Sequence, residues 1–300
     1  MAPANLSICI VNYQAGDYLR NCLGSIIANP PQRDYEIIVV DNGSTDDSLK
    51  MLHDEFPGVT LIENPANLGF TAPTNQALRR AQGQFLLLLN PDTLVHPQAF
   101  DRLINFMQEH PQVGICGPKV LNTDGSLQAP CRRGESRPWA VISYFLRLHR
   151  LFPDSKLFGG YLMNYMDEDA THEVAGVAGS CMLIRRQVIE QIGYLDEHFF
   201  AYQEDADYCF QARRAGWQVY YVPGARVTHF GGEGGSRVQP YRSIYAWHRS
   251  YWLYYRKNLA SDYFFLFNWV FYLAMLVKLI LALLANLFRP AKRAGRQQPK

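Results

Sequence analysis

Several polar side chains have the types and spacing needed to bind a charged or hydroxylated ligand. The first group, residues 41–46, has the sequence DNGSTD and directly follows the apolar run Glu36–Val40. Asp41 can accept hydrogen bonds from a nucleobase imide or from ribose hydroxyls. The same run can instead form an ordinary Asx turn or a helix cap, and the residues alone leave both interpretations open.

A second group, Asn90-Pro91-Asp92, follows four consecutive leucines. Mg²⁺ is usually bound through one or two carboxylates, with phosphates and waters in the remaining positions. Asp92 is therefore a candidate ligand for Mg²⁺ or Mn²⁺ that neutralises a diphosphate. The alternative is a carboxylate that caps a helix beginning near Pro97.

The second half of the chain contributes three carboxylates and a histidine. Glu204, Asp205 and Asp207 lie within four positions after an aromatic run, and His229 shortly precedes two glycines. Repulsion among crowded carboxylates raises the pKa of at least one of them, which suits a general base. Acidic residues also stabilise the first turn of a helix, and a lone histidine is more often structural than a ligand.

The elements that must position these residues alternate between residues 6 and 120. Apolar runs predict strands at Leu6–Val11, Glu36–Val40, Val59–Ile62, Phe85–Leu89 and Val113–Cys116. Helical spacing predicts helices at Tyr18–Ile27, Ser48–Phe56, Asn75–Ala81 and Ala99–Glu109. This alternation predicts an α/β fold with a mostly parallel sheet flanked by helices. Ligands bind at the carboxyl ends of such strands, so the polar loops there should meet at one rim.

Beyond residue 120 the pattern is less regular. Prolines and arginines interrupt residues 121–175, and we expect an insertion that shapes an acceptor site. Regular structure is predicted again at Val174–Ile184, in a helix at Asp205–Ala215 and in a strand at Gln218–Val222.

The C-terminal end has three segments of different composition. Residues 237–262 combine basic and aromatic side chains, residues 263–288 are almost entirely apolar, and residues 289–300 form a basic tail. About 20 apolar residues can span a bilayer, so the apolar segment predicts a membrane-associated or transmembrane helix. Lys278 is costly at the centre of a bilayer, whereas a helix lying in the membrane plane would let it reach the interface. A core helix is the remaining alternative.

The composition is that of a folded chain with reduced thiols. Of 300 residues, 48% are hydrophobic and 19% are charged, which excludes a disordered or collagen-like chain. Residues 1–288 hold 24 basic and 27 acidic side chains, which argues against a nucleic-acid partner. Six scattered cysteines without a CxxC pair predict buried thiols. No signal-peptide pattern occurs in the first dozen residues, so we expect a cytoplasmic chain.

Together the motifs resemble those of a known enzyme family. In order they are VDNGSTD, NPANLGF, LLNPD, IGYLDEHFFAYQEDADYC, AGW and HFGG. Their order and spacing are similar to those of the inverting family 2 glycosyltransferases of the GT-A fold, in particular the rhamnosyltransferase-like branch. The resemblance covers roughly residues 6–257, and it implies a Rossmann-like GT-A catalytic domain at residues 1–236.

The resemblance also implies roles for the candidate residues. The implied catalytic residues are Asp205 as general base and Glu204 and Asp207 as the groups that position it. The implied ligands of Mg²⁺ or Mn²⁺ are Asp92 and His229. Trp217 would lie behind the acceptor-binding side of the site. The implied donor-binding residues are Asn12, Tyr13, Asp41, Asn42, Ser44, Asp46, Asn67, Gly69 and Asn90. Asn90 stands where many relatives have the first aspartate of an Asp-X-Asp motif.

The activity implied by the resemblance is transfer of rhamnose from deoxythymidine-diphosphate-rhamnose to a polyprenyl-diphosphate-linked glycan. The implied setting is the cytoplasmic face of the bacterial inner membrane, with membrane lipids as further partners. Two alternatives remain open. One is a uridine- or guanosine-diphosphate sugar with a soluble or peptide acceptor. The other is a catalytically silent nucleotide-binding scaffold, which is suggested by the asparagine at position 90.

Overall fold

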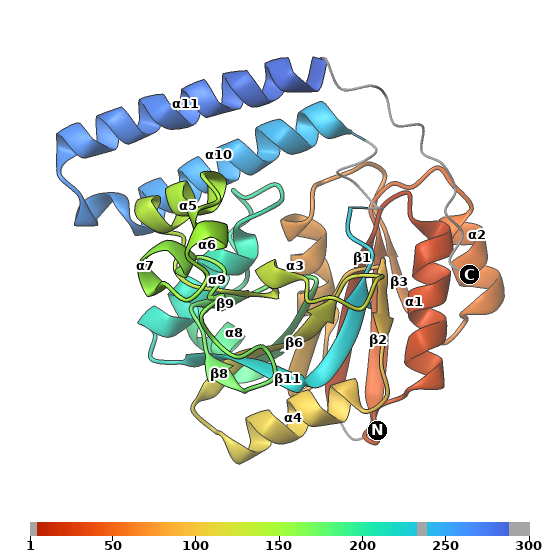
Figure 1. Cartoon of the computed structure of the whole chain (residues 1–300). Helices are drawn as coiled ribbons and strands as arrows, with labels where there is room; N and C mark the ends of the chain where they lie inside the picture. Colours follow the sequence, from red (N-terminus) through yellow and green to blue (C-terminus); the bar gives the residue numbers. More distant parts are fainter. Residues whose placement is uncertain (1–4, 233–238, 288–300) are drawn as a thin grey trace.

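The computed structural model describes residues 5–232 and 239–287, and strands alternate with helices in its first half (Figure 1). The elements of that half are β1 (Leu6–Asn12), α1 (Gly16–Ala28), β2 (Tyr35–Asp41), α2 (Ser48–Glu55), β3 (Thr60–Glu63), α3 (Thr71–Arg80), β4 (Phe85–Leu89), β5 (Thr93–Val95), α4 (Ala99–Glu109) and β6 (Val113–Leu121). The later strands are β7 (Arg132–Arg133), β8 (His172–Glu173), β9 (Gly176–Val177), β10 (Cys181–Arg185) and β11 (Gln218–His229). The later helices are η1 (Ala129–Cys131), α5 (Pro138–Phe145), α6 (Leu148–Leu151), α7 (Lys156–Gly159), α8 (Arg186–Ile192), α9 (Glu204–Arg214), α10 (Pro240–Asn258), η2 (Ala260–Asp262) and α11 (Phe265–Leu287).

A nine-stranded sheet forms the centre of the molecule, in the order β3-β2-β1-β4-β10-β6-β11-β5, with β8 paired to β11. β1 runs parallel to β2 and β4, and β6 runs parallel to β11. β10 is antiparallel to both β4 and β6, so it joins two groups of strands that point the same way. The predicted α/β fold with a mostly parallel sheet is confirmed.

Helices pack on both faces of this sheet. α1 and α2 lie on one side of β1–β3 and α3 lies on the other (Figure 1). The apolar core fills the space between them, and Leu86 and Leu87 of β4 are fully buried within it. All six cysteines are buried and free, which confirms the prediction of reduced thiols.

Several predicted elements are longer in the structure, among them β6, which continues past Cys116 to Leu121. α3 begins four residues early, at Thr71, because Pro73 is compatible with a first helical turn, where its missing N–H has no helical partner. β11 continues past Val222 to His229, because a shift of register between Val222 and Arg226 accommodates the intervening Pro-Gly step. The segment predicted to be irregular contains three short helices, α5–α7.

The C-terminal helices α10 and α11 lie side by side (Figure 1). The most apolar 18-residue window of α11 has a mean hydropathy of 2.3, and only 11% of it is buried. That exposure excludes the core-helix alternative. Within the described ranges, α11 is the one helix long and apolar enough to span a membrane. The predicted tail at 289–300 and the predicted boundary at residue 236 lie outside the described residues, and the division into segments stays a prediction.

Candidate functional site

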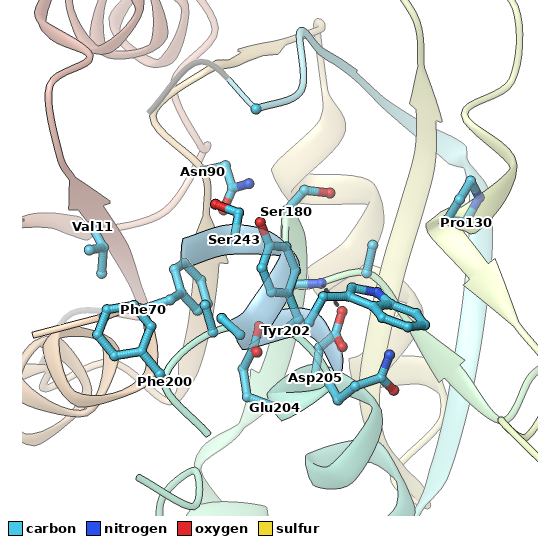
Figure 2. Close-up of a pocket in the computed structure, with 18 of the residues that line it drawn as sticks. Val11, Phe70, Asn90, Pro130, Ser180, Phe200, Tyr202, Glu204, Asp205 and Ser243 are labelled. Carbon is cyan, nitrogen blue, oxygen red and sulfur yellow. Dashed lines mark hydrogen bonds between the residues drawn. The ribbon is translucent and has the colours of Figure 1, made fainter. Parts of the chain in front are cut away.

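A cavity of about 500 Å³ lies at one edge of the sheet (Figure 2). β1, β2, β4 and β11 all end at this edge, where Asn12, Asp41, Asn90 and His229 are found. β10 runs in the opposite direction, so the loop before it, residues 178–180, also reaches the cavity. The polar loops therefore converge on one rim, because the carboxyl ends of parallel strands share an edge.

Asp92 and His229 meet on one wall of the cavity. Asp92 Oδ1 lies 3.1 Å from His229 Nε2, and both side chains are largely buried. Gln128 Nε2 donates to the main-chain carbonyl of His229 at 3.2 Å, which turns Gln128 Oε1 toward His229 Nδ1 at 2.8 Å. Nδ1 therefore donates its proton to Gln128. Nε2 faces Asp92 and the Asn90 amide nitrogen, which is 3.2 Å away.

This arrangement fits a divalent cation. Two acceptor atoms 3.1 Å apart match adjacent positions around an octahedral ion with bonds near 2.1 Å, which are roughly 3.0 Å apart. No group of three or more His, Cys, Asp or Glu side chains able to hold a metal occurs among the residues that the structure describes. Asp92 and His229 would thus be two protein ligands, with phosphate oxygens and waters as the others. Asp92 does not cap a helix, because Gln98 is the N-cap residue of α4.

Asp205 lies in the first turn of α9 with its carboxylate toward the same cavity (Figure 2). Its Oδ2 accepts from Arg133 Nη2 at 2.6 Å and from Gly179 N at 2.9 Å, and its Oδ1 accepts from Ala206 N at 2.7 Å. Arg133 is itself buried and comes from β7. A carboxylate has about four acceptor sites, so Oδ1 keeps one for a ligand while Oδ2 is held in place.

Glu204 has an unusual environment for a carboxyl group. It is buried, and its Oε2 has no hydrogen-bond partner within residues 5–232 and 239–287. Burial, and to a smaller extent the charge of Asp205, raises the pKa of Glu204 to about 8. Tyr202 and Gln203, which precede it, have φ of +67° and +62°. This backbone conformation is uncommon outside glycine and concentrates at functional sites.

Asn42 connects the loop after β2 to the NPANLGF segment. Its Nδ2 donates to the Gly69 carbonyl at 2.7 Å and to Asn67 Oδ1 at 3.1 Å. Gly69 has a φ of +94°, and a Cβ there would lie 2.3 Å from the Phe200 carbonyl oxygen. All four residues line the cavity together with Tyr13. The NPANLGF segment therefore forms one wall of the cavity, and the position of this wall depends on the close contact between Gly69 and the Phe200 carbonyl.

Other predicted donor residues lie behind this wall. Asp41 Oδ2 accepts from Asn12 Nδ2 at 2.9 Å, and Asp41 Oδ1 accepts from Ser44 N at 2.9 Å. Asp46 accepts from Ser48 N at 3.2 Å, at the start of α2. Among the residues that the structure describes, the predicted donor residues Asn12, Asp41, Ser44 and Asp46 do not line the cavity. Their hydrogen bonds hold the loops at its rim in place.

Two predicted site residues lie elsewhere. Asp207 faces α10, where it accepts from Lys257 Nζ at 2.8 Å and Asn258 Nδ2 at 2.7 Å. Trp217 directly precedes β11, at the edge of the sheet opposite the cavity, and its Nε1 donates to Gln191 Oε1 at 2.7 Å. The structure therefore corrects the expectation that Trp217 backs the acceptor side. Asp207 anchors α10 and lies outside the cavity wall.

Gln128, Arg133 and Trp247 line the cavity although no sequence motif predicts them there. Trp247 belongs to α10, whose aromatic side chains recur along the helix, and it lines the cavity with Tyr144 of α5. The repeated aromatic side chains of α10 could therefore have predicted Trp247 as a binding residue. Gln128 and Arg133 lie in an irregular segment with no local pattern, so only their tertiary contacts identify them.

Comparisons with known proteins match this chain to one family and one fold. A model of glycosyl transferase family 2 matches residues 7–193. The N-acetylglucosaminyl-diphospho-decaprenol L-rhamnosyltransferase of Mycobacterium tuberculosis is 28% identical over 264 residues, covering 83% of each chain. Among solved structures, a Pyrobaculum calidifontis mannosyltransferase in complex with GDP-Man and Mn²⁺ has a TM-score of 0.56 at 17% identity, covering 83% of this chain and 65% of that one. GalNAc-T7 with UDP, GalNAc and Mn²⁺ has a TM-score of 0.57 at 18% identity, covering 76% of this chain and 43% of that one.

Proposed function

The chain belongs to glycosyl transferase family 2, and we propose that it transfers rhamnose from a nucleotide-diphosphate donor to a glycan on a polyprenyl diphosphate. The observation that carries this proposal is that Asp92, His229 and Asp205 line a single cavity. Sugar transfer needs two things at once. The departing diphosphate needs its growing charge neutralised, and the incoming hydroxyl needs a base.

Asp205 is the proposed general base. Arg133 and the Gly179 amide hold Oδ2, so Oδ1 is the atom with an acceptor site for the hydroxyl proton. The acceptor oxygen bonds to the anomeric carbon as its proton passes to Asp205. The bond from that carbon to the diphosphate oxygen breaks, and its electron pair leaves with the nucleotide. One displacement of this kind inverts the anomeric configuration.

Asp92 and His229 are the proposed ligands of Mg²⁺ or Mn²⁺, which would neutralise the charge on the leaving diphosphate. Asn90 replaces an aspartate, and its Nδ2 lies 3.2 Å from His229 Nε2, beside the proposed metal ligands. The Asp92–His229 pair is intact with this asparagine present, which favours an enzyme over a silent scaffold. Arg242, stacked 4.3 Å over the Phe200 ring at the cavity, provides a positive charge for a phosphate.

The sugar and the acceptor are proposed from the Mycobacterium tuberculosis relative, whose name describes L-rhamnose transfer onto N-acetylglucosaminyl-diphospho-decaprenol. Deoxythymidine-diphosphate-rhamnose is the proposed donor here. A polyprenyl-linked acceptor stays in a bilayer, which agrees with the apolar helix α11. The proposed setting is the cytoplasmic face of a bacterial inner membrane, during cell-wall or surface polysaccharide synthesis.

A donor panel tests the proposal. The full chain in detergent receives deoxythymidine-diphosphate-rhamnose or a uridine- or guanosine-diphosphate sugar, with Mn²⁺ and either a short-chain N-acetylglucosaminyl-diphospho-polyprenol or a soluble sugar. We expect mass spectrometry to detect product with the rhamnose donor and the lipid-linked acceptor. Asp205→Asn keeps the side-chain shape and removes the base, so its turnover should fall about 10²–10⁴-fold with nucleotide affinity retained.

The other outcomes separate the alternatives. Product from a uridine- or guanosine-diphosphate sugar on the soluble acceptor would replace both the proposed donor and the proposed acceptor. Nucleotide binding without transfer from any donor would support the scaffold. Unchanged turnover in folded Asp205→Asn would remove Asp205 as the base.

A further inference from the structure

Two exposed apolar surfaces lie on elements that contact each other, α5–α7 and α11. The first is on α5–α7 and the short loops between and after them, and its most exposed members include Leu146, Leu151 and Leu157, at 61–70%. The second is one face of α11, formed by Leu266, Val270, Leu273, Val277, Leu281 and Leu284. Phe145 of α5 contacts the inner side of α11, because Lys278 Nζ lies 4.0 Å from the centroid of its ring.

α11 cannot change its direction independently of the rest of the protein. Its inner face packs along α10, where the rings of Tyr255 and Phe271 are 4.6 Å apart and Lys278 Nζ is 3.0 Å from His248 Nε2. α10 is fixed to the sheet domain in turn, by Ser250 Oγ donating to the Ala201 carbonyl and by the contacts of Asp207. If α11 crossed a bilayer, α10 and its polar contacts would have to enter the hydrocarbon with it, at a cost of several kcal/mol for each unsatisfied group.

Lys278 also favours a helix that does not cross. It lies near the middle of α11, its Nζ is 4.3 Å from the centroid of the Trp247 ring and 4.0 Å from that of Phe145, and it bonds to His248. These contacts satisfy the ammonium group on the protein side of the helix. The apolar face of α11 is left without a charged residue, as expected for a helix that lies along the boundary of a membrane.

The charge on the α5–α7 surface is complementary to anionic lipid. Residues 138–160 hold three basic side chains and one acidic side chain, whereas the rest of residues 1–288 holds 21 basic and 26 acidic ones. Arg147, Arg150 and Lys156 are exposed among the apolar side chains of α5–α7. Basic residues beside an apolar face are typical of helices that bind the surface of anionic membranes.

We propose that α5–α7 and α11 form one membrane-binding surface, on which an anionic lipid leaflet lies, with α11 in the plane of the leaflet and not across it. α5 lines the cavity through Tyr144, and α10, against which α11 packs, lines it through Trp247. A lipid-linked acceptor would therefore enter from the leaflet with its chain still in the membrane. Only this last step rests on the proposed function; the binding surface does not.

Vesicle flotation tests the surface without any donor or acceptor, so its result is independent of the proposed reaction. The probes are phosphatidylcholine vesicles with and without phosphatidylglycerol. Leu151→Glu changes the α5–α7 surface, Leu281→Glu changes the α11 surface, and Ile27→Glu changes an exposed residue of α1 as the matched control. Losing the burial of one leucine corresponds to about tenfold weaker binding. We expect that loss for Leu151→Glu and Leu281→Glu, none for Ile27→Glu, and weaker binding without phosphatidylglycerol.

A protease-protection assay tests the orientation of α11. An epitope tag after residue 300 is examined in sealed spheroplasts and in inside-out vesicles. We expect the tag to be digested only in inside-out vesicles, on the same side as a tag before residue 1. Digestion of the C-terminal tag from outside the spheroplasts would show that α11 crosses and would overturn the proposal. Wild-type binding by Leu151→Glu would also overturn it, as would a dimer that buries these surfaces and does not bind vesicles.

Discussion

Replacing Gly69 by alanine tests the tight contact that forms the donor-side wall. Gly69 has a φ of +94°, and an added Cβ would lie 2.3 Å from the Phe200 carbonyl oxygen and 2.8 Å from its ring. Ordinary C···O contacts are about 3.3–3.6 Å, so the two segments must separate by about 1 Å. That separation breaks the 2.6 Å hydrogen bond from Phe70 N to Phe200 O.

The magnitude follows from these contacts and a matched control. Gly125 has a φ of +83° with nothing within 4 Å of an added Cβ, so Gly125→Ala has a similar backbone strain and no overlap. A lost hydrogen bond costs about 1 kcal/mol and overpacking about 1–3 kcal/mol. Gly69→Ala should therefore be less stable than Gly125→Ala by about 2–4 kcal/mol.

The assays are thermal unfolding and calorimetric titration with nucleotide diphosphate. We expect Gly69→Ala to unfold several degrees below Gly125→Ala and to bind nucleotide at least tenfold more weakly, because Asn67, Phe70 and Phe200 line the cavity. Equal melting temperatures and equal affinities in the two variants would refute the argument that this approach positions the wall.

Three further predictions concern the cavity. Burial raises the pKa of Glu204 to about 8, so its ionisation above that pH adds negative charge near the diphosphate. The donor KM should therefore rise above pH 8 in the wild type, and it should not change with pH in Glu204→Gln. Gln128→Leu removes the acceptor for His229 Nδ1 and should weaken Mn²⁺-supported nucleotide binding about 10–100-fold, as measured by Mn²⁺ titration; unaltered Mn²⁺ dependence would contradict the metal assignment. Trp247→Ala should raise the KM for a lipid-linked acceptor with nucleotide affinity unchanged, whereas Trp217→Ala, outside the cavity, should leave both constants unchanged.

Local pattern predicts much of the fold and part of the site. β4 and α4 have the predicted bounds, Phe85–Leu89 and Ala99–Glu109. Both were predictable because a buried strand and an amphipathic helix each have a distinct spacing of apolar residues. The motifs that resemble a known family also single out Asp92, Asp205 and His229, and all three line the cavity. Asp92 and His229 lie at one rim because β4 and β11 run in the same direction and end there.

Only the tertiary structure decides which side chains meet. Gln128 bonds to His229 across 101 positions because the parallel neighbours β6 and β11 end side by side, and Arg133 pairs with Asp205 because β7 pairs with β9, just before the loop that contacts Asp205. The same long-range order places Trp247 at the cavity and Trp217 at the opposite edge. The apolar composition of α11 predicts only that this helix avoids water. Its direction relative to a membrane depends on the helix against which it packs, and that contact is not local in sequence.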